Sequence, residues 1–232
     1  MNYAIILSGG TGTRLGSDIP KQYIEVGGKP IIMYCLQTME QANCIDEICI
    51  VAAKEWQPKI SEWVREAGMQ KVCGFADAGK TRQHSLINGL KFFAEKNKEK
   101  GSAVLIHDAA RPNVSENLLT RCFDNLKDAD GVLPVIPVKD TMYLSEDKKT
   151  ISGLLNRDQI FSGQAPESFD FEKYYQINME LTDEEISNVR GTAEIAFRKG
   201  LSVRLTDGDE NNYKITTSAD LEKFRDQIER NQ

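Results

Sequence analysis

Short apolar runs alternate with helical patterns up to residue 138, and this alternation constrains the fold more than any other feature. Strands are expected at 3–7, 47–53, 103–107 and 131–138, and helices at 29–42, 58–67, 82–97 and 115–126. A β-α-β-α order predicts an α/β fold, a mostly parallel sheet with helices on both faces. Ligands then bind beyond the carboxyl ends of the strands.

The pattern changes after Asp140, where short extended pieces replace the strand–helix units. Segments 141–144 and 150–155 flank a charged turn at 145–149, which predicts a β-hairpin arm at about 140–160. The last dozen residues predict a polar surface helix. A chain of 232 residues is long enough for one sizeable domain and short for two. We therefore expect one domain over 1–232 that carries the arm.

Composition excludes several classes of function. The formal net charge of −6 argues against a duplex nucleic-acid binder, which would carry a basic surface, but allows a small anionic ligand. Five cysteines without a CxxC pair predict reduced thiols and a cytoplasmic protein. Two histidines are too few for a clustered zinc site. No basic signal-peptide start and no membrane-spanning apolar run occur, so no membrane association is expected.

A glycine-rich turn directly follows the first strand. It contains Ser8, Gly9, Gly10, Thr11, Gly12 and Arg14, and Pro20-Lys21-Gln22 comes after it. Glycines let backbone N–H groups surround an anion, and Arg14 and Lys21 add two cations that can reach the same phosphates. The spacing matches neither a Walker loop nor a dinucleotide-binding turn. A plain strand-to-helix turn is the alternative, which the two downstream cations disfavour.

Three further motifs place charged residues at expected strand or helix ends. Asp108 ends an apolar strand, where its carboxylate can hold Mg2+ on a triphosphate or, alternatively, cap the next segment. Arg82 and Ser85 begin a helix and can face an anion there, although a solvated Arg at a capped helix start is the alternative. Lys214 is expected on a short strand, either as a surface ion-pair partner or as a phosphate ligand.

Together these motifs resemble the family of cytidylyltransferases that activate methylerythritol phosphate and ribitol 5-phosphate. They occur in the family's order from Ser8 to Leu221: GGxGxR and PKQ at 9–22, RQxS at 82–85, HDAARP at 107–112, DT at 140–141, NR at 156–157, QAP at 164–166 and KIT at 214–216. The resemblance implies a Rossmann-like domain, CTP as substrate with Mg2+ as cofactor, and a homodimer in which the arm passes between subunits.

The resemblance also implies roles for individual residues. Arg14, Lys21 and Lys214 would be catalytic and stabilise the charge that builds during in-line attack on the α-phosphate. The nucleotide would be bound by the turn residues Ser8, Gly9, Gly10, Thr11 and Gly12, and by Arg82, Ser85 and Asp108. Asp108 would also hold the metal. The acceptor would be bound by Asp108, Thr141, Arg157, Thr192 and Lys214, with Arg157 acting in the neighbouring subunit's site.

The chain departs from the family pattern on the acceptor side. Gln164-Ala-Pro-Glu167 stands where the family usually has Gln-Thr-Pro-Gln, and Thr192-Ala-Glu194 stands where it usually has Thr-Asp followed by a small residue. The nucleotide side is intact, which supports CTP as substrate. Ser8-Gly-Gly-Thr11, Trp56 and Lys214-Ile-Thr-Thr217 are similar to the ribitol-phosphate branch, so the resemblance favours transfer of CMP to ribitol 5-phosphate or a related polyol phosphate used in cell-wall or capsule polymers. Methylerythritol 4-phosphate, used in isoprenoid synthesis, is the alternative acceptor because HDAARP is usual in that branch.

Two other functions stay open at this point. A sugar-1-phosphate nucleotidyltransferase that uses UTP or dTTP has a similar glycine-rich N-terminal turn. A catalytically silent nucleotide-binding regulator would account for the changes at Ala165 and Ala193. An NAD-dependent dehydrogenase is disfavoured, because the glycine spacing does not fit and no acidic residue ends a second strand in the expected place.

Overall fold

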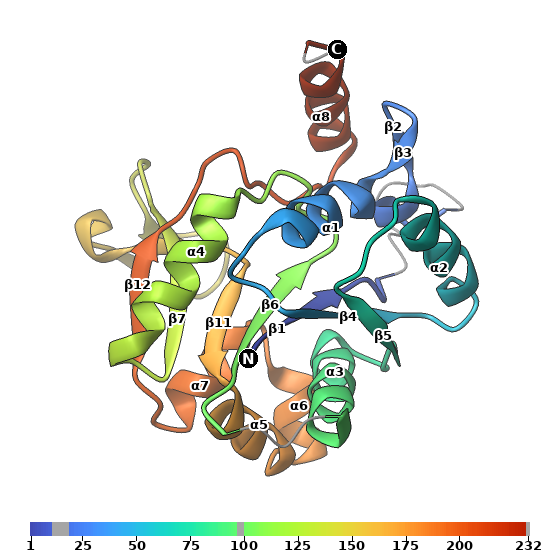
Figure 1. Cartoon of the computed structure of the whole chain (residues 1–232). Helices are drawn as coiled ribbons and strands as arrows, with labels where there is room; N and C mark the ends of the chain where they lie inside the picture. The colour runs from blue at the N-terminus through green and yellow to red at the C-terminus, as the bar shows by residue number, and fades with distance from the viewer. Residues whose placement is uncertain (11–18, 97–99, 231–232) are drawn as a thin grey trace.

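A computed structural model describes residues 1–10, 19–96 and 100–230 of the chain. Within these residues, eight strands form the main sheet in the order β10-β7-β11-β6-β1-β4-β5, with β12 paired to β7. Their bounds are β1 (Asn2–Leu7), β4 (Glu47–Ala52), β5 (Val72–Asp77), β6 (Ala103–Asp108), β7 (Gly131–Pro137), β10 (Phe161–Gly163), β11 (Glu167–Asp170) and β12 (Val203–Asp207). The sheet runs through the centre of the molecule in Figure 1.

The sheet is mostly parallel, as predicted. Strand β1 pairs in parallel with both β4 and β6, and β5 adds to the outer edge of β4. Strands β10 and β11 run in the opposite direction, and β11 lies between β6 and β7. The start of β11 therefore lies at the same edge of the sheet as the carboxyl ends of the parallel strands.

Helices cover both faces of the sheet because successive side chains of a strand point to opposite sides. Ala4 and Ile6 of β1 face one core cluster, whereas Tyr3, Ile5 and Leu7 face the other. The first cluster packs against α1 (Ile31–Gln41), α2 (Gln57–Glu66) and α4 (Glu116–Asp124). The other face carries α3 (Arg82–Lys96), α5 (Phe171–Met179), α6 (Asp183–Asn188) and α7 (Thr192–Arg198).

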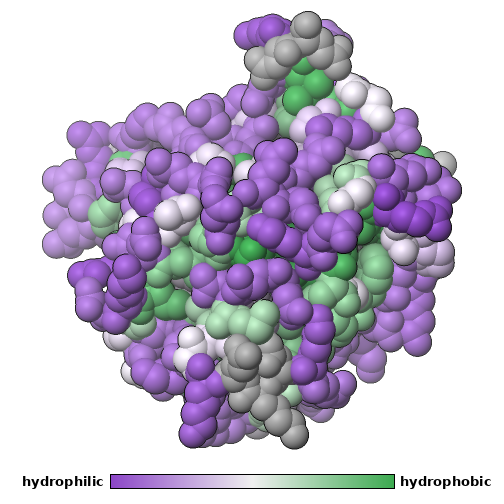
Figure 2. Space-filling model, in the orientation of Figure 1, coloured by the Kyte–Doolittle hydropathy of each residue, from purple (hydrophilic) through white to green (hydrophobic). Residues whose placement is uncertain are grey.

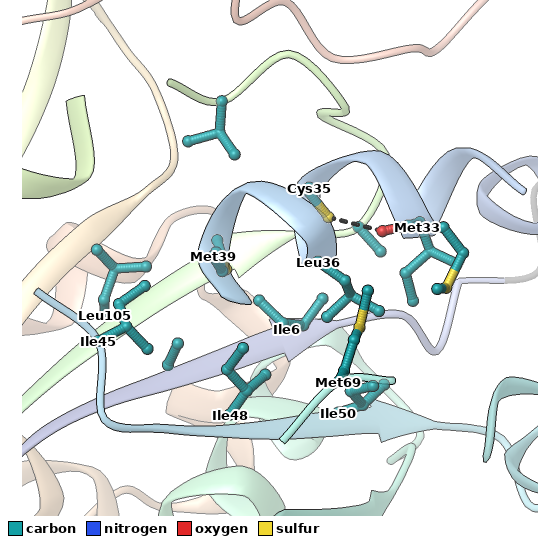
Figure 3. Close-up of a cluster of buried hydrophobic side chains, with 14 of the residues drawn as sticks. Ile6, Met33, Cys35, Leu36, Met39, Ile45, Ile48, Ile50, Met69 and Leu105 are labelled. Carbon is teal, nitrogen blue, oxygen red and sulfur yellow. Dashed lines mark hydrogen bonds between the residues drawn. The ribbon is translucent and has the colours of Figure 1, made fainter. Parts of the chain in front are cut away.

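The first core cluster joins α1 to the central strands (Figure 3). Leu36 and Met39 of α1 lie against Ile6 of β1 and Ile48 of β4, and all four side chains are fully buried. The Cys35 thiol donates to the carbonyl oxygen of Ile32 at 3.1 Å. Packing of this kind fixes the position of β1, and with it the start of the turn that follows.

The predicted arm is present as a small hairpin of β8 (Tyr143–Leu144) and β9 (Gly153–Leu154). Asp147 orders its tip by accepting hydrogen bonds from the N–H groups of Lys149 and Thr150, both at 2.8 Å. In Figure 1 this segment, in yellow tones, lies beside β12 at the edge of the molecule. A short 3-10 helix, η4 (Arg157–Gln159), ends the arm, and the chain then re-enters the main sheet as β10.

The C-terminal helix α8 (Ser218–Arg230) was expected to be a polar surface helix, but one of its faces is buried. Leu221 and Phe224 pack against Val26 and Ile31, beside the short ribbon of β2 (Glu25–Val26) and β3 (Lys29–Pro30). The helix stands at the top of Figure 1, and Figure 2 shows that this face of the molecule is mostly hydrophilic. The strand expected at Lys214 is not formed: residues 213–216 are irregular.

Candidate active site

A cavity of about 470 Å³ opens at the carboxyl ends of the parallel strands. Five described segments contribute to it: the end of β1 with the start of the turn after it, Lys21 with Gln22, the loop before α3 with the start of that helix, the end of β6, and the stretch before α8. It is lined by Leu7, Gly9, Gly10, Lys21, Gln22, Gly79, Lys80, Thr81, Arg82, Ser85, Asp108, Ala110 and Lys214. The described residues therefore form a cavity at the edge of the sheet where the sequence predicts ligand binding.

The described part of the glycine-rich turn is held from below by two side chains of η2 (Lys21–Tyr23). The Gln22 amide nitrogen donates to the carbonyl oxygens of Ser8 at 2.7 Å and Gly10 at 2.8 Å. Tyr23 donates to the Ser8 carbonyl at 2.9 Å, and the Ser8 hydroxyl donates back to Tyr23 at 2.8 Å. Together with the bond from the Ser8 N–H to the Val51 carbonyl oxygen at 2.8 Å, these bonds fix the described start of the turn.

Glycine is required at position 9 by a close approach of two loops. A Cβ atom added to Gly9 would lie 2.5 Å from the Cβ atom of Ala78, which is closer than real contacts allow. The predicted site residues Thr11, Gly12 and Arg14 lie outside the described residues. Lys21, by contrast, lies on the cavity wall.

The loop before α3 is shaped by Ser85. Its hydroxyl accepts from the Gly79 N–H at 2.9 Å and donates to the Thr81 carbonyl oxygen at 3.1 Å. Ser85 therefore lines the cavity, but its hydroxyl is already hydrogen-bonded within this loop. Lys80, in the same loop, adds a cation to the wall.

Asp108 is the centre of the charged part of the site. Its Oδ1 lies 3.1 Å from Nη2 of Arg82, and its Oδ2 lies 2.9 Å from Nζ of Lys214 and 3.8 Å from Nε of Arg111. Burial alone would raise the pKa of Asp108, but the charges of Arg82, Lys214 and Arg111 hold it well below its usual range. The carboxyl is therefore ionised, and three cations surround one anion.

The described residues fit the metal expected at Asp108 only if phosphate oxygens of the bound substrate and water supply most of its ligands. Among the described residues, no group of three or more His, Cys, Asp or Glu side chains could enclose a metal ion. Mg2+ commonly binds through one or two carboxylates and completes its shell with phosphate oxygens and water. Asp108 can supply such a carboxylate, in competition with the cations that now pair with it.

A second cavity of about 370 Å³ adjoins the first and shares Arg82, Asp108 and Lys214 with it. Its other walls are Arg111, Leu133, Gly163, Gln164, Ala165, Glu167, Arg190, Gly191, Thr192, Ala193 and Glu194. Of the residues predicted to bind the acceptor, it contains Asp108, Lys214 and Thr192, whose hydroxyl accepts from Arg82 at 2.8 Å. Thr141 and Arg157 line neither cavity, and Arg157 donates to the Lys139 carbonyl oxygen at 3.0 Å.

Sequence reasoning gave no role to Gln22, Arg111 or Glu167, all of which lie in these walls. Arg111 donates to the Asn212 carbonyl oxygen at 2.7 Å, but its buried Nε has no hydrogen-bond partner among the described residues. Arg111 is part of the HDAARP motif, so the sequence contained a signal that could have identified it. His107 of that motif is fully buried and bonds to the Arg111 carbonyl oxygen, and burial lowers its pKa to about 4, so it is a neutral structural residue.

Among the described residues, no helix combines the length and the apolar character needed to cross a bilayer. The charged cavities and the exposed arm belong to an α/β structure. Its apolar side chains lie mainly between the sheet and its helices.

Known proteins that this chain resembles in sequence and fold are named as cytidylyltransferases. Residues 2–228 match the family model described as IspD, 2-C-methyl-D-erythritol 4-phosphate cytidylyltransferase. The chain is 32% identical over 224 residues to the 2-C-methyl-D-erythritol 4-phosphate cytidylyltransferase of Lachnospira eligens, covering 96% of each chain. It is 29% identical to the ribitol-5-phosphate cytidylyltransferase of Lacticaseibacillus paracasei, covering 96% of this chain and 95% of the relative.

Solved structures agree with the sequence comparison. The crystal structure of the 4-diphosphocytidyl-2C-methyl-D-erythritol synthase of Anaerococcus prevotii superposes with a TM-score of 0.82 at 26% identity, covering 99% of this chain and 96% of that one. The family match spans both cavities and every described segment that lines them. The chain therefore belongs to the IspD family of cytidylyltransferases, a class of nucleotidyltransferases.

Proposed function

We propose that this enzyme transfers CMP from CTP to a polyol phosphate, with ribitol 5-phosphate as the first candidate, and releases pyrophosphate. The observation that carries the proposal is the pair of adjoining cavities that share Arg82, Asp108 and Lys214. One cavity has the glycine turn and Lys21 expected for a triphosphate. The other lies on the far side of the shared charges, where a second anion can approach the α-phosphate.

The reaction on this geometry is an in-line displacement. A phosphate oxygen of the acceptor attacks the α-phosphorus and forms a new P–O bond, while the bond to the β-phosphate oxygen breaks and its electron pair leaves with pyrophosphate. The acceptor oxygen is already an anion, so no general base is needed. The difficulty is to bring two polyanions together, and fixed cations solve it by positioning and charge stabilisation.

The residues divide this work by position. Lys21 lies on the wall of the first cavity, where it can stabilise charge on the α-phosphate. Arg82 and Lys214 stand at the boundary of the two cavities and can contact both anions. Asp108 keeps these two cations in place through its hydrogen bonds. Mg2+, held by Asp108 and the triphosphate, would neutralise further phosphate charge when bound.

The polar wall of the second cavity favours a polyol as acceptor. Glu167 supplies a buried carboxyl there, and Ala165 and Ala193 leave room beside it. A carboxyl surrounded by protein suits an acceptor rich in hydroxyl groups better than one that presents a methyl group. Methylerythritol 4-phosphate is the second candidate, because relatives that carry this activity are 32% identical to the chain.

An acceptor panel tests the proposal. Pyrophosphate release is measured with CTP and Mg2+ against ribitol 5-phosphate, glycerol 3-phosphate and methylerythritol 4-phosphate. We expect the highest kcat/KM with ribitol 5-phosphate. A higher value with methylerythritol 4-phosphate would assign the enzyme to isoprenoid synthesis. CTP binding without turnover of any acceptor would instead support the silent regulator, and a calorimetric comparison of CTP, UTP and dTTP tests the nucleotide.

We further infer a cytoplasmic homodimer that forms through the arm. Tyr143, Leu144, Ile151 and Leu154 are each more than half exposed on the arm, with exposures of 57%, 51%, 68% and 67%. Apolar side chains gathered on a small hairpin are typical of a surface that another protein covers. In such a dimer, Thr141 and Arg157 would reach the acceptor of the neighbouring subunit.

A further inference from the structure

Glu167 is a buried carboxyl that the proposed reaction does not use. It is the first residue of β11 and pairs with Ile106 of β6, two residues before Asp108. Because β11 runs antiparallel to β6, its first residue lies at the edge where the parallel strands end. Strand direction thus places this carboxyl in the wall of the second cavity.

The contacts of Glu167 leave much of its charge uncompensated. Its Oε2 accepts from the Ala193 N–H at 2.7 Å, and the side chain is only 7% exposed. Among the described residues, no ion pair with a Lys or Arg side chain is formed. Burial raises the pKa of Glu167 to about 7, although the nearby charge of Arg82 and the Thr192 hydroxyl oppose this rise. A buried carboxyl without a cation costs stability, which points to a use in the cavity.

We propose that Glu167 is a specificity-determining residue that accepts hydrogen bonds from hydroxyl groups of the acceptor. The inference rests on the proposed function and names the chemistry that this wall recognises, a phosphate ester with at least one free hydroxyl away from its phosphate. A carboxylate accepts hydrogen bonds and repels anions, so it takes the hydroxyl end of the acceptor. The phosphate end is directed to the cations Arg82, Arg111 and Lys214, which line the same cavity.

Small residues around the carboxyl give the hydroxyl end its space. Gly163, Ala165, Gly191 and Ala193 line the cavity beside Glu167. Thr192 is not available as a competing donor to the acceptor, because its hydroxyl accepts a hydrogen bond from Arg82 and is also hydrogen-bonded to Glu167. The carboxyl of Glu167 therefore lies in this wall beside small residues that leave space for the hydroxyl end of an acceptor.

The test combines one substitution with one change in the substrate. Glu167→Gln keeps the shape of the side chain but removes its charge, and Glu184→Gln is the control because it removes one charge from an exposed position on α6. Each enzyme is assayed with CTP against ribitol 5-phosphate and against analogues that each lack one hydroxyl. Thermal unfolding checks that both variants are folded, and Glu167→Asp tests rescue by a conservative carboxylate.

We expect Glu167→Gln to raise the KM of the acceptor about tenfold or more, as for the loss of a hydrogen bond to a charged group. The KM of CTP should change less than twofold, and Glu184→Gln should match the wild type. With the wild type, one deoxy analogue should have a much lower kcat/KM than ribitol 5-phosphate. With Glu167→Gln, the same analogue should have a kcat/KM no lower than that of ribitol 5-phosphate, because the substitution and the missing hydroxyl remove the same hydrogen bond.

Equal losses with every deoxy analogue in both enzymes would overturn this inference and leave the proposed function intact. A wild-type enzyme that turns over CTP with none of the acceptors would overturn the proposed function and this inference with it. Should methylerythritol 4-phosphate be the only acceptor, the same comparison is made with its deoxy analogues, and the same two outcomes decide.

Discussion

Asp108 sets the charge balance of the site at the scale of single residues. Its pairing with Arg82 spans 26 residues of sequence, and its pairing with Lys214 spans 106. The sequence motifs identified these three residues as functional, but neither separation predicts that they meet on one carboxylate. The meeting depends on β6 ending between α3 and the stretch before α8. Because three cations then surround one anion, the centre attracts polyanions.

At Lys21, we expect Lys21→Ala to lower kcat on the order of a hundredfold, because its charge matters most when charge builds on the α-phosphate. The affinity for CTP should fall far less. Steady-state kinetics and calorimetric CTP titration measure the two effects, with the exposed Lys54→Ala as control. Equal losses in turnover and affinity would assign Lys21 to ground-state binding alone.

Glu167 should also make the stability of the protein depend on pH. Its pKa is raised from 4.5 to about 7 in the folded protein, so the unfolded chain binds fewer protons between these values. The free energy of unfolding then falls as pH rises through this window, on the order of 1 kcal/mol per pH unit. Glu167→Gln removes this contribution and should gain stability relative to the wild type from pH 5 to 7. Urea unfolding at each pH measures the difference, and identical slopes would contradict the prediction.

At the scale of elements, strands made of uninterrupted apolar runs were predictable, whereas the buried strand β11, with its mixed sequence, was not. β1, β4 and β6 are uninterrupted apolar runs because both of their faces are covered by helices. β11 has the sequence Glu-Ser-Phe-Asp, and it forms a strand because it fills the space between β6 and β7. No local sequence pattern predicts a strand that forms only because of its neighbours, and sequence reasoning gave Glu167, the first residue of β11, no role for the same reason.

The glycine turn gives a matched pair of substitutions at this scale. Gly9→Ala introduces a Cβ atom 2.5 Å from Ala78, whereas a Cβ atom at Gly10 meets nothing within 4 Å. Overpacking of this kind costs about 1–3 kcal/mol, so Gly9→Ala should lower the melting temperature by several degrees and Gly10→Ala should not. Thermal unfolding followed by circular dichroism makes the comparison. Similar melting temperatures for the two variants would show that the loops separate easily.

At the scale of the whole molecule, the arm is the feature that a single subunit does not explain. The sequence predicted its position because a charged turn lies between two short extended pieces. Its apolar side chains contribute little to the cores of the described subunit. The sheet and its helices fit the single domain expected over 1–232, and we expect the proposed homodimer to cover the arm.

If the arm joins two subunits, Leu154→Asp should convert a dimer to a monomer, because a charge would be buried in an apolar contact. Leu205→Asp, on an exposed part of β12, is the matched control and should stay dimeric. Sedimentation velocity at several concentrations gives the masses. A monomeric wild type, or a dimer that survives Leu154→Asp, would contradict the prediction. Loss of acceptor turnover in the monomer would follow from the absent Arg157 of the neighbour.

The reversed strand β11 has a consequence for how this scaffold can be altered. The turn after β1 and the end of β6 belong to the parallel framework, whereas residues 163–167 enter the same edge from the opposite direction. Exchange of this short stretch between relatives should therefore retarget an enzyme to a new acceptor while its nucleotide preference is kept. If Glu167 selects the acceptor as proposed, acceptor preference and nucleotide preference can change independently of each other, because they reside in different segments of the chain.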